Sequence, residues 1–107
     1  MFDWGLRLAQ GTQEWHDSAP LPWEREVERF FATIARFDDY LASDAPLGSH
    51  ADKLFQGPVA DALTHVGQIR MLRRLAACPI RGENYFKAEI IAGRVGAEQV
   101  PPRREFD

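Results

Sequence analysis

GPVADALTHVGQIRMLRR, residues 57–74, is the stretch that decides the fold expected for this chain. Its apolar residues recur at steps of three and four, which is the period of an α-helix. They cover so wide an arc that we expect a central helix, touching neighbours on more than one side. We expect it to span residues 51–76 and to kink at Pro58, which cannot donate to the residue four before it. The arc consists of Val59, Ala62, Leu63, Val66, Ile69, Leu72 and Leu75.

A second helix is expected over residues 22–42, the clearest amphipathic pattern in the chain. Apolar side chains lie on one face, and charged side chains occupy the other. Pro22 suits the first turn of a helix, where its fixed φ and missing N–H are tolerated. The apolar face, whose phenylalanines we expect in the core, consists of Val27, Phe30, Phe31, Ile34, Phe37 and Leu41.

Two shorter helices complete the predicted set. Residues 2–10 place apolar side chains on one stripe, and Gly11 then supplies a C-terminal stop. Residues 85–92 follow Asn84, a good N-cap, and are ended by Gly93. We therefore expect four helical segments in all.

The length of 107 residues suits one domain with a single core and leaves no room for a second. No alternation of apolar and polar residues predicts a strand. The sequence therefore predicts an all-α fold. Residues 1–93 are expected to form one small helical bundle, and residues 94–107 an extended or mobile tail.

The charge balance argues against a nucleic-acid-binding protein. The formal net charge is -3, whereas phosphate contacts require a concentrated basic surface. One local cluster of arginines near the end of the central helix is explained by the helix dipole, with capture of a single anion as the alternative. The cluster consists of Arg70, Arg73, Arg74 and Arg81.

The chain is expected in the cytoplasm. Its single cysteine, Cys78, cannot form an internal disulfide, so a reducing compartment suits it. No apolar run is long enough to cross a membrane, and residues 1–10 lack the pattern of a signal peptide.

Asp61 and His65 are the candidate metal ligands. Residues four apart on a helix share a face, so this carboxylate and imidazole can reach one cation or each other. We expect them at the interior of the bundle or its rim. A catalytic zinc usually takes three protein ligands, and His50 is the candidate third. The alternative is a purely structural hydrogen bond between Asp61 and His65.

Gly67 and Gln68 follow the candidate ligands directly. Glycine admits close approach of a neighbouring helix, at a propensity cost of about 1 kcal/mol. Gln68 can donate or accept a hydrogen bond across such a contact. A packing role is therefore expected for both residues.

The run ADALTHVGQIRMLRRLA, residues 60–76, with the following PIRGENYF, residues 79–86, resembles the last conserved helix region of DinB-like proteins. These are metal-binding four-helix bundles, unrelated to the DNA polymerase of similar name. Their helix commonly reads His-x-x-x-His-x-Gly-Gln-Ile. Residues 65–69 match its second half, and Asp61 stands where the first His would be. Residues 2–4 and 20–31 are similar to a subset of the same family.

The resemblance implies a nickel, zinc or iron ion held by three side chains, two from this helix and one His from an earlier helix. That His and a whole first helix would be expected just ahead of Phe2. A bundle without that helix exposes an apolar groove. We therefore expect either a homodimer whose partner helices cover each other's open faces, or a natural protein that is longer than this chain.

Two functional hypotheses follow from the resemblance. The first is a dimeric, non-catalytic DinB-like helical module in which Asp61 and His65 only hydrogen-bond. The second is a metal-dependent enzyme of thiol-transferase or hydrolase type, with Asp61 and His65 as ligands and a small-molecule substrate that the sequence does not identify.

Overall fold

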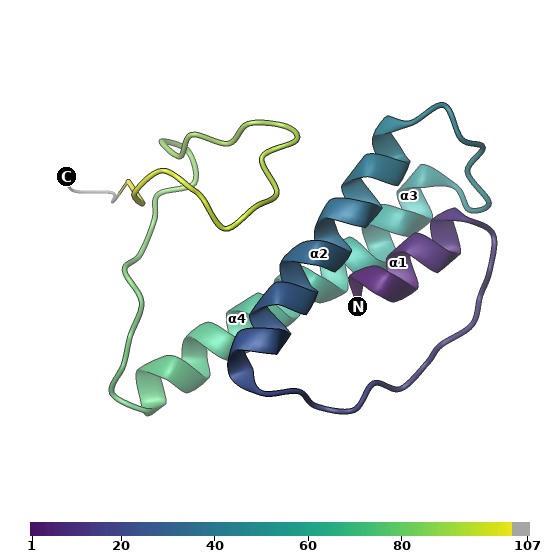
Figure 1. Cartoon of the computed structure of the whole chain (residues 1–107). Coiled ribbons are helices and arrows are strands. Elements are labelled where there is room, and N and C mark those ends of the chain that lie inside the picture. Colours follow the sequence, from purple (N-terminus) through teal and green to yellow (C-terminus); the bar gives the residue numbers. More distant parts are fainter. Residues whose placement is uncertain (104–107) are drawn as a thin grey trace.

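The computed structural model describes residues 1–103 and confirms an all-α fold (Figure 1). It contains α1 (Phe2–Ala9), α2 (Trp23–Ala42) and a broken third helix of three parts, α3 (Ala51–Leu54), η1 (Phe55–Val59) and α4 (Ala60–Leu75). No strand occurs within the described residues. Because α1 packs against α2 on one side and against η1 and α3 on the other, the helices form a small bundle.

The core of this bundle is small and lies where α1 meets α2 and the broken helix. Ala9, Phe37 and Leu54 are buried, and Pro58 is the largest fully enclosed side chain. Five partly buried side chains pack around this centre. They are Phe2, Leu6, Leu8, Tyr40 and Val59.

Of the phenylalanines predicted for the core of α2, only Phe37 is buried. Phe37 is 3% exposed, whereas Phe30 is 45% exposed and packs edge-on against Phe2, with ring centroids 5.7 Å apart. The reason is helix length. α1 has eight residues and spans about 12 Å, so it cannot cover the roughly 30 Å of the 20-residue α2.

The interruption expected at Gly57-Pro58 is confirmed, and it takes the form of the π-helical turn η1. Pro58 has no N–H, and its ring would clash with the carbonyl of residue 54 in a regular α-helix. A wider turn relieves that clash. Pro58 then packs on Gly5 of α1, where a Cβ atom would lie only 3.0 Å from the Pro58 Cβ. The close approach of α1 and η1 therefore depends on Gly5.

α1 and α4 end in the same backbone motif. Gly11 has φ 89°, and the N–H groups of Gly11 and Thr12 donate to the carbonyls of Leu8 and Arg7. This is the left-handed C-terminal cap that favours glycine, so the predicted stop at Gly11 is confirmed. Ala77, with φ 56°, takes the same role after α4.

α4 is not the central helix that the sequence predicted. None of its residues is buried, and its C-terminal half runs beyond α2 in Figure 1. The expectation of neighbours on more than one side is wrong, because α1 and α2 make at most weak contact with α4, and a groove lies between α2 and α4. Its large apolar side chains remain exposed: Leu63, Val66, Ile69, Met71, Leu72 and Leu75.

Residues 85–92 do not form the predicted helix. Asn84 does begin a turn, since its Oδ1 accepts a hydrogen bond from the Phe86 N–H at 3.0 Å. The turn does not propagate, because Phe86 is 97% exposed and Ile90 79% exposed, and so short a helix is marginal without packing. Beyond it, residues 94–103 contain neither helix nor strand, and the last four residues of the predicted tail lie outside the described residues.

Candidate metal half-site

Asp61 and His65 lie one turn apart on α4, as their spacing predicted. The Asp61 Oδ1 is 3.7 Å from the His65 Nε2. The side chain of His65 is 54% exposed and that of Asp61 is 48% exposed. The pair therefore lies on the surface of the helix. The expected interior position is wrong, and only His65 reaches the rim of the bundle, where it borders a groove.

Gln68 orients the imidazole of His65. The His65 Nδ1 lies 2.9 Å from the Gln68 Oε1. A carbonyl oxygen only accepts hydrogen bonds, so Nδ1 is the donor in this contact. In the neutral ring, Nε2 then carries a lone pair and faces the Asp61 carboxylate, which is also an acceptor. With this tautomer, a cation between the two side chains would be bound by both of them.

His50 does not join this pair. Within residues 1–103, no three His, Cys, Asp or Glu side chains come close enough to hold a metal ion together. His50 instead stands at the N-cap position of α3, without a side-chain capping hydrogen bond, and borders a small pocket with Leu8 and Gln13. The three-ligand site that the resemblance implies does not fit the described part of one chain, which supplies two ligands.

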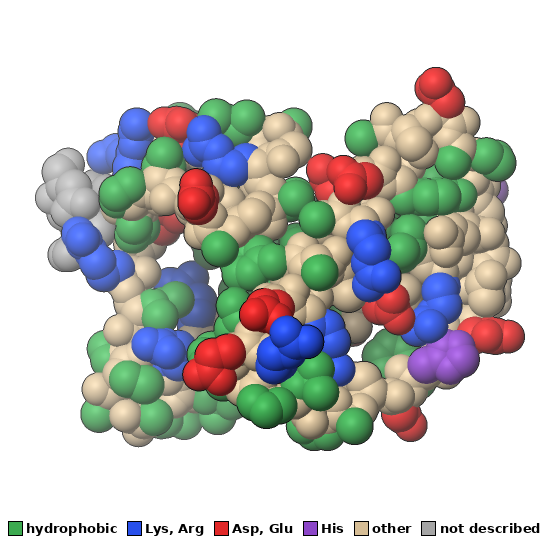
Figure 2. Space-filling model, viewed as in Figure 1, with side chains coloured by type: hydrophobic (Ala, Val, Ile, Leu, Met, Phe, Trp, Pro, Cys, Tyr) green, Lys and Arg blue, Asp and Glu red, His purple; other side chains and the backbone are tan. Residues whose placement is uncertain are grey.

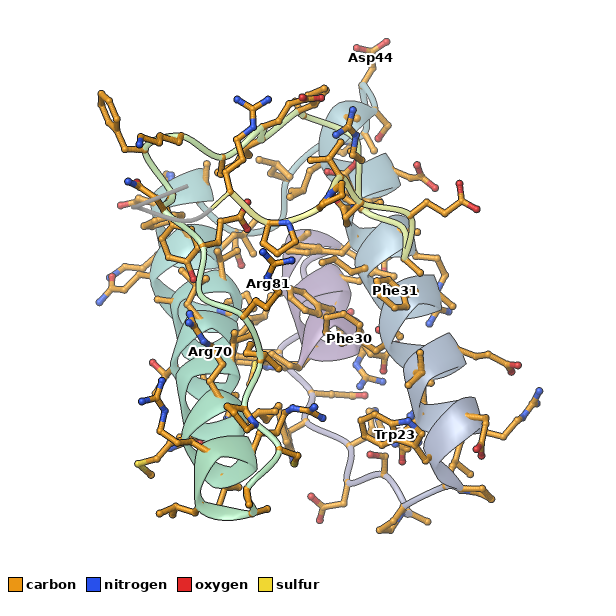
Figure 3. The ribbon with its side chains drawn as sticks, turned by 90° about the vertical axis from the view of Figure 1, so that its left-hand side faces the viewer. Trp23, Phe30, Phe31, Asp44, Arg70 and Arg81 are labelled. Atoms are coloured by element: carbon orange, nitrogen blue, oxygen red, sulfur yellow. The ribbon has the colours of Figure 1, made fainter. Side chains whose placement is uncertain are left out.

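An apolar groove of about 630 Å³ separates α2 from α4. Figure 3 shows these two helices side by side, with α1 behind them and Phe30 projecting between them. Among the residues that line the groove, only Asp38 and His65 have polar side chains. Val95, from the segment after α4, also lines it. The rest of the lining is Met1, Phe2, Phe30, Ile34, Phe37, Leu41, Val59, Ala62, Leu63, Val66 and Ile69.

The predicted arginine cluster serves partly to fasten the C-terminal segment. The Arg70 Nη1 donates to the Tyr85 hydroxyl at 3.1 Å. Arg70 and Arg74 also line a small pocket with Pro79 and Ile80, just after α4. In Figure 3 Arg81 lies in this segment, above Arg70. The arrangement agrees with arginines that complement the C-terminal end of a helix.

The surface that sequence reasoning missed is a stripe along the outside of α4, which we name the outer stripe. Its members are spaced by four, three, four and three residues, the spacing of the a and d positions in a coiled coil. That spacing is present in the sequence. Leu72 and Leu75 were assigned there to the wide apolar arc of the same helix, so the stripe was not recognised. All five members are exposed: Asp61, His65, Gln68, Leu72 and Leu75.

Gly67 does not mark a close helix contact within the chain. A Cβ atom at this position would meet no atom within 4 Å. Gly67→Ala should therefore raise the free energy of unfolding by about 1 kcal/mol, because alanine costs less backbone entropy in an exposed helix. Urea unfolding followed by circular dichroism measures the change. An unchanged or lowered stability would contradict the open environment of Gly67.

Comparison of the chain with protein-family models, curated proteins and solved structures found no match. None of the helices in residues 1–103 combines the length and the hydropathy needed to cross a bilayer. Figure 2 shows charged side chains of both signs on the face in view, with hydrophobic side chains gathered at the lower left, where α4 ends in Figure 1.

Proposed function

We propose that this chain is a DinB-like helical protein that acts as a homodimer, as a binding module and not as a catalyst. The observation that carries the proposal is the uncovered apolar surface of α4. Leu72 is 61% exposed and Leu75 is 76% exposed. Apart from η1, from which α4 continues, no helix within residues 1–103 makes more than a weak contact with α4. The sequence of residues 60–76 supports the family assignment.

The exposed leucines carry a free-energy cost that association removes. Each Å² of apolar surface left in water costs about 25 cal/mol. Contiguous exposed apolar patches on a small protein mark interaction sites. A buried core of Ala9, Phe37, Leu54 and Pro58 offers little stability to offset such exposure.

A second copy of the chain is the partner that the outer stripe fits. A stripe with coiled-coil spacing pairs best with another helix of the same spacing, and an identical chain supplies one. Gln68 lies at the middle of the stripe, and its amide can both donate and accept, so two Gln68 side chains are complementary.

We place this dimer in the cytoplasm. Cys78 is free and exposed. A reducing compartment protects such a thiol from accidental disulfide formation.

The metal-dependent alternative is supported by one observation, the acceptor groups of Asp61 and His65 that face each other at 3.7 Å. A cation between them would satisfy both. A catalytic site of this kind usually needs a third protein ligand, which the described residues of one chain do not bring to the pair. The dimer is therefore the conclusion that the geometry supports best.

Leu72→Glu tests the dimer. It should weaken association about tenfold or more, because it places a charge in the paired stripe. The control is Met71→Glu, since Met71 is exposed to a similar extent, 58%, but lies off the stripe. Light scattering at tens of micromolar protein measures both. If the wild-type chain is a monomer, or if the two variants associate equally well, the proposed dimer contact is wrong.

A further inference from the structure

The groove between α2 and α4 has the size and the lining of a small-molecule pocket. We propose that it binds an apolar primary amine, with the alkyl chain in the groove and the ammonium group on the Asp38 carboxylate. The site lies within one chain, so it does not depend on the proposed homodimer.

The volume of the groove favours a small molecule over a partner helix. It is about 630 Å³, within the range of roughly 300–1,000 Å³ that is usual for ligand pockets. A helix about 10 Å across that followed α2 from Phe30 to Leu41, about 16 Å, would occupy about 1,200 Å³. Such a helix would lie largely outside the groove, whereas an alkyl chain fits within it.

Asp38 is the polar group that remains available to a ligand. It is half-buried where it lines the groove. Within residues 1–103 its carboxylate has no hydrogen bond and no ion pair. The other polar lining residue, His65, directs its Nδ1 at Gln68 and its Nε2 toward Asp61. A ligand with one polar group would therefore meet Asp38.

The arginines beside the groove do not neutralise Asp38. Each arginine that is next in sequence to a lining residue has another side chain as its partner, through a hydrogen bond or an ion pair. These pairs are Arg29–Glu26, Arg36–Asp3, Arg70–Tyr85 and Arg94–Glu89. The groove therefore carries an uncompensated negative charge, which attracts a cation and repels an anion.

An ammonium group suits Asp38 once the groove is filled. A ligand that covers the groove removes water from the carboxylate, and a carboxylate without water or a partner costs free energy. An ammonium replaces that water with a charge-assisted hydrogen bond. A neutral hydroxyl gives a weaker hydrogen bond, and a carboxylate on the ligand is repelled.

The spacing along α2 sets the length of the alkyl chain. From Asp38 back to Phe30 the helix rises about 12 Å. An extended decyl chain, built from C–C bonds of about 1.5 Å, is about 12 Å long. Decylamine with its nitrogen at Asp38 would therefore reach Phe30, which projects between α2 and α4 (Figure 3).

Calorimetric titration of the full chain with decylamine tests the proposal. We expect one decylamine per chain, bound about tenfold or more tightly than decanol or decanoate. Asp38→Asn keeps the shape of the side chain and removes its charge. It should weaken decylamine binding about tenfold or more and leave decanol binding unchanged. The matched control is Asp39→Asn, since Asp39 is exposed and does not line the groove, and it should bind decylamine as the wild type does.

Ala62→Trp tests the location of the site. Ala62 lines the groove, so a tryptophan there should fill part of it and abolish decylamine binding. The control is Thr64→Trp, which adds the same side chain at an exposed position of α4 outside the groove and should leave binding intact. Circular dichroism shows whether both variants keep the helical fold.

Three results would overturn the amine site. They are equal affinity for decylamine, decanol and decanoate, equal weakening by Asp38→Asn and Asp39→Asn, and no binding of decylamine to the wild type. Decylamine binding that persists in Ala62→Trp would also overturn it, because the ligand would then lie elsewhere.

Leu72→Glu separates the amine site from the proposed homodimer. Leu72 does not line the groove, so this variant should still bind one decylamine per chain while it associates more weakly. Loss of decylamine binding in Leu72→Glu would overturn a site within one chain. A chain that is monomeric and binds decylamine would overturn the homodimer and support the amine site.

Discussion

Phe37→Ala is expected to lower the free energy of unfolding by about 3–5 kcal/mol. Phe37 is 3% exposed and is the one aromatic residue in the buried core of residues 1–103. Its ring lies 6.2 Å from that of Phe2, so the change also removes an aromatic contact between α1 and α2. Small domains have a total stability of only about 5–15 kcal/mol, and this change should remove a large part of it.

The control for this change is Phe86→Ala. Phe86 is 97% exposed, so the same substitution there should stay within about 0.5 kcal/mol of the wild type. Urea unfolding of the three proteins gives the comparison. Equal losses at Phe37 and Phe86 would show that the core does not lie between α1 and α2.

Gly5→Leu is expected to destabilise the chain by about 3 kcal/mol through overpacking. A Cβ atom at position 5 would lie 3.0 Å from the Pro58 Cβ and 3.4 Å from the Phe37 Cζ. A leucine must therefore push α1 away from η1. Because Pro58 is fully enclosed and rigid, it cannot move aside as a flexible surface side chain would.

Gly67→Leu is the matched control, since it adds the same side chain to α4. A Cβ atom at position 67 would meet no atom within 4 Å. The change should leave stability unchanged or raise it, because leucine has a higher helix propensity than glycine. Thermal unfolding distinguishes the two variants. A tolerated leucine at position 5 would contradict the close contact between α1 and η1.

The helices that could be predicted from the sequence are those with strong local signals. The α2 pattern and the Gly11 cap each act over a few residues, and both are present as expected. The segment at residues 85–92 also has a good N-cap, but nothing within residues 1–103 covers its Phe86 and Ile90 side chains, which are 97% and 79% exposed. Capping starts a helix, and packing is what maintains one of this length.

The candidate site was predictable in part. The four-residue spacing of Asp61 and His65 was sufficient to place them together on α4. Their exposure was not predictable, because a wide apolar arc looks the same whether its neighbours belong to the same chain or to another. The position of His50 also depends on the π-helical turn at Pro58. The sequence predicted an interruption of the helix there, but not the geometry of the turn.

Sedimentation equilibrium of the unmodified chain is the measurement that tests the homodimer most directly. The chain has a mass of 12.2 kDa. With protein at tens of micromolar, we expect twice that mass, falling toward the single-chain value on dilution. A mass of one chain at every concentration would contradict the homodimer.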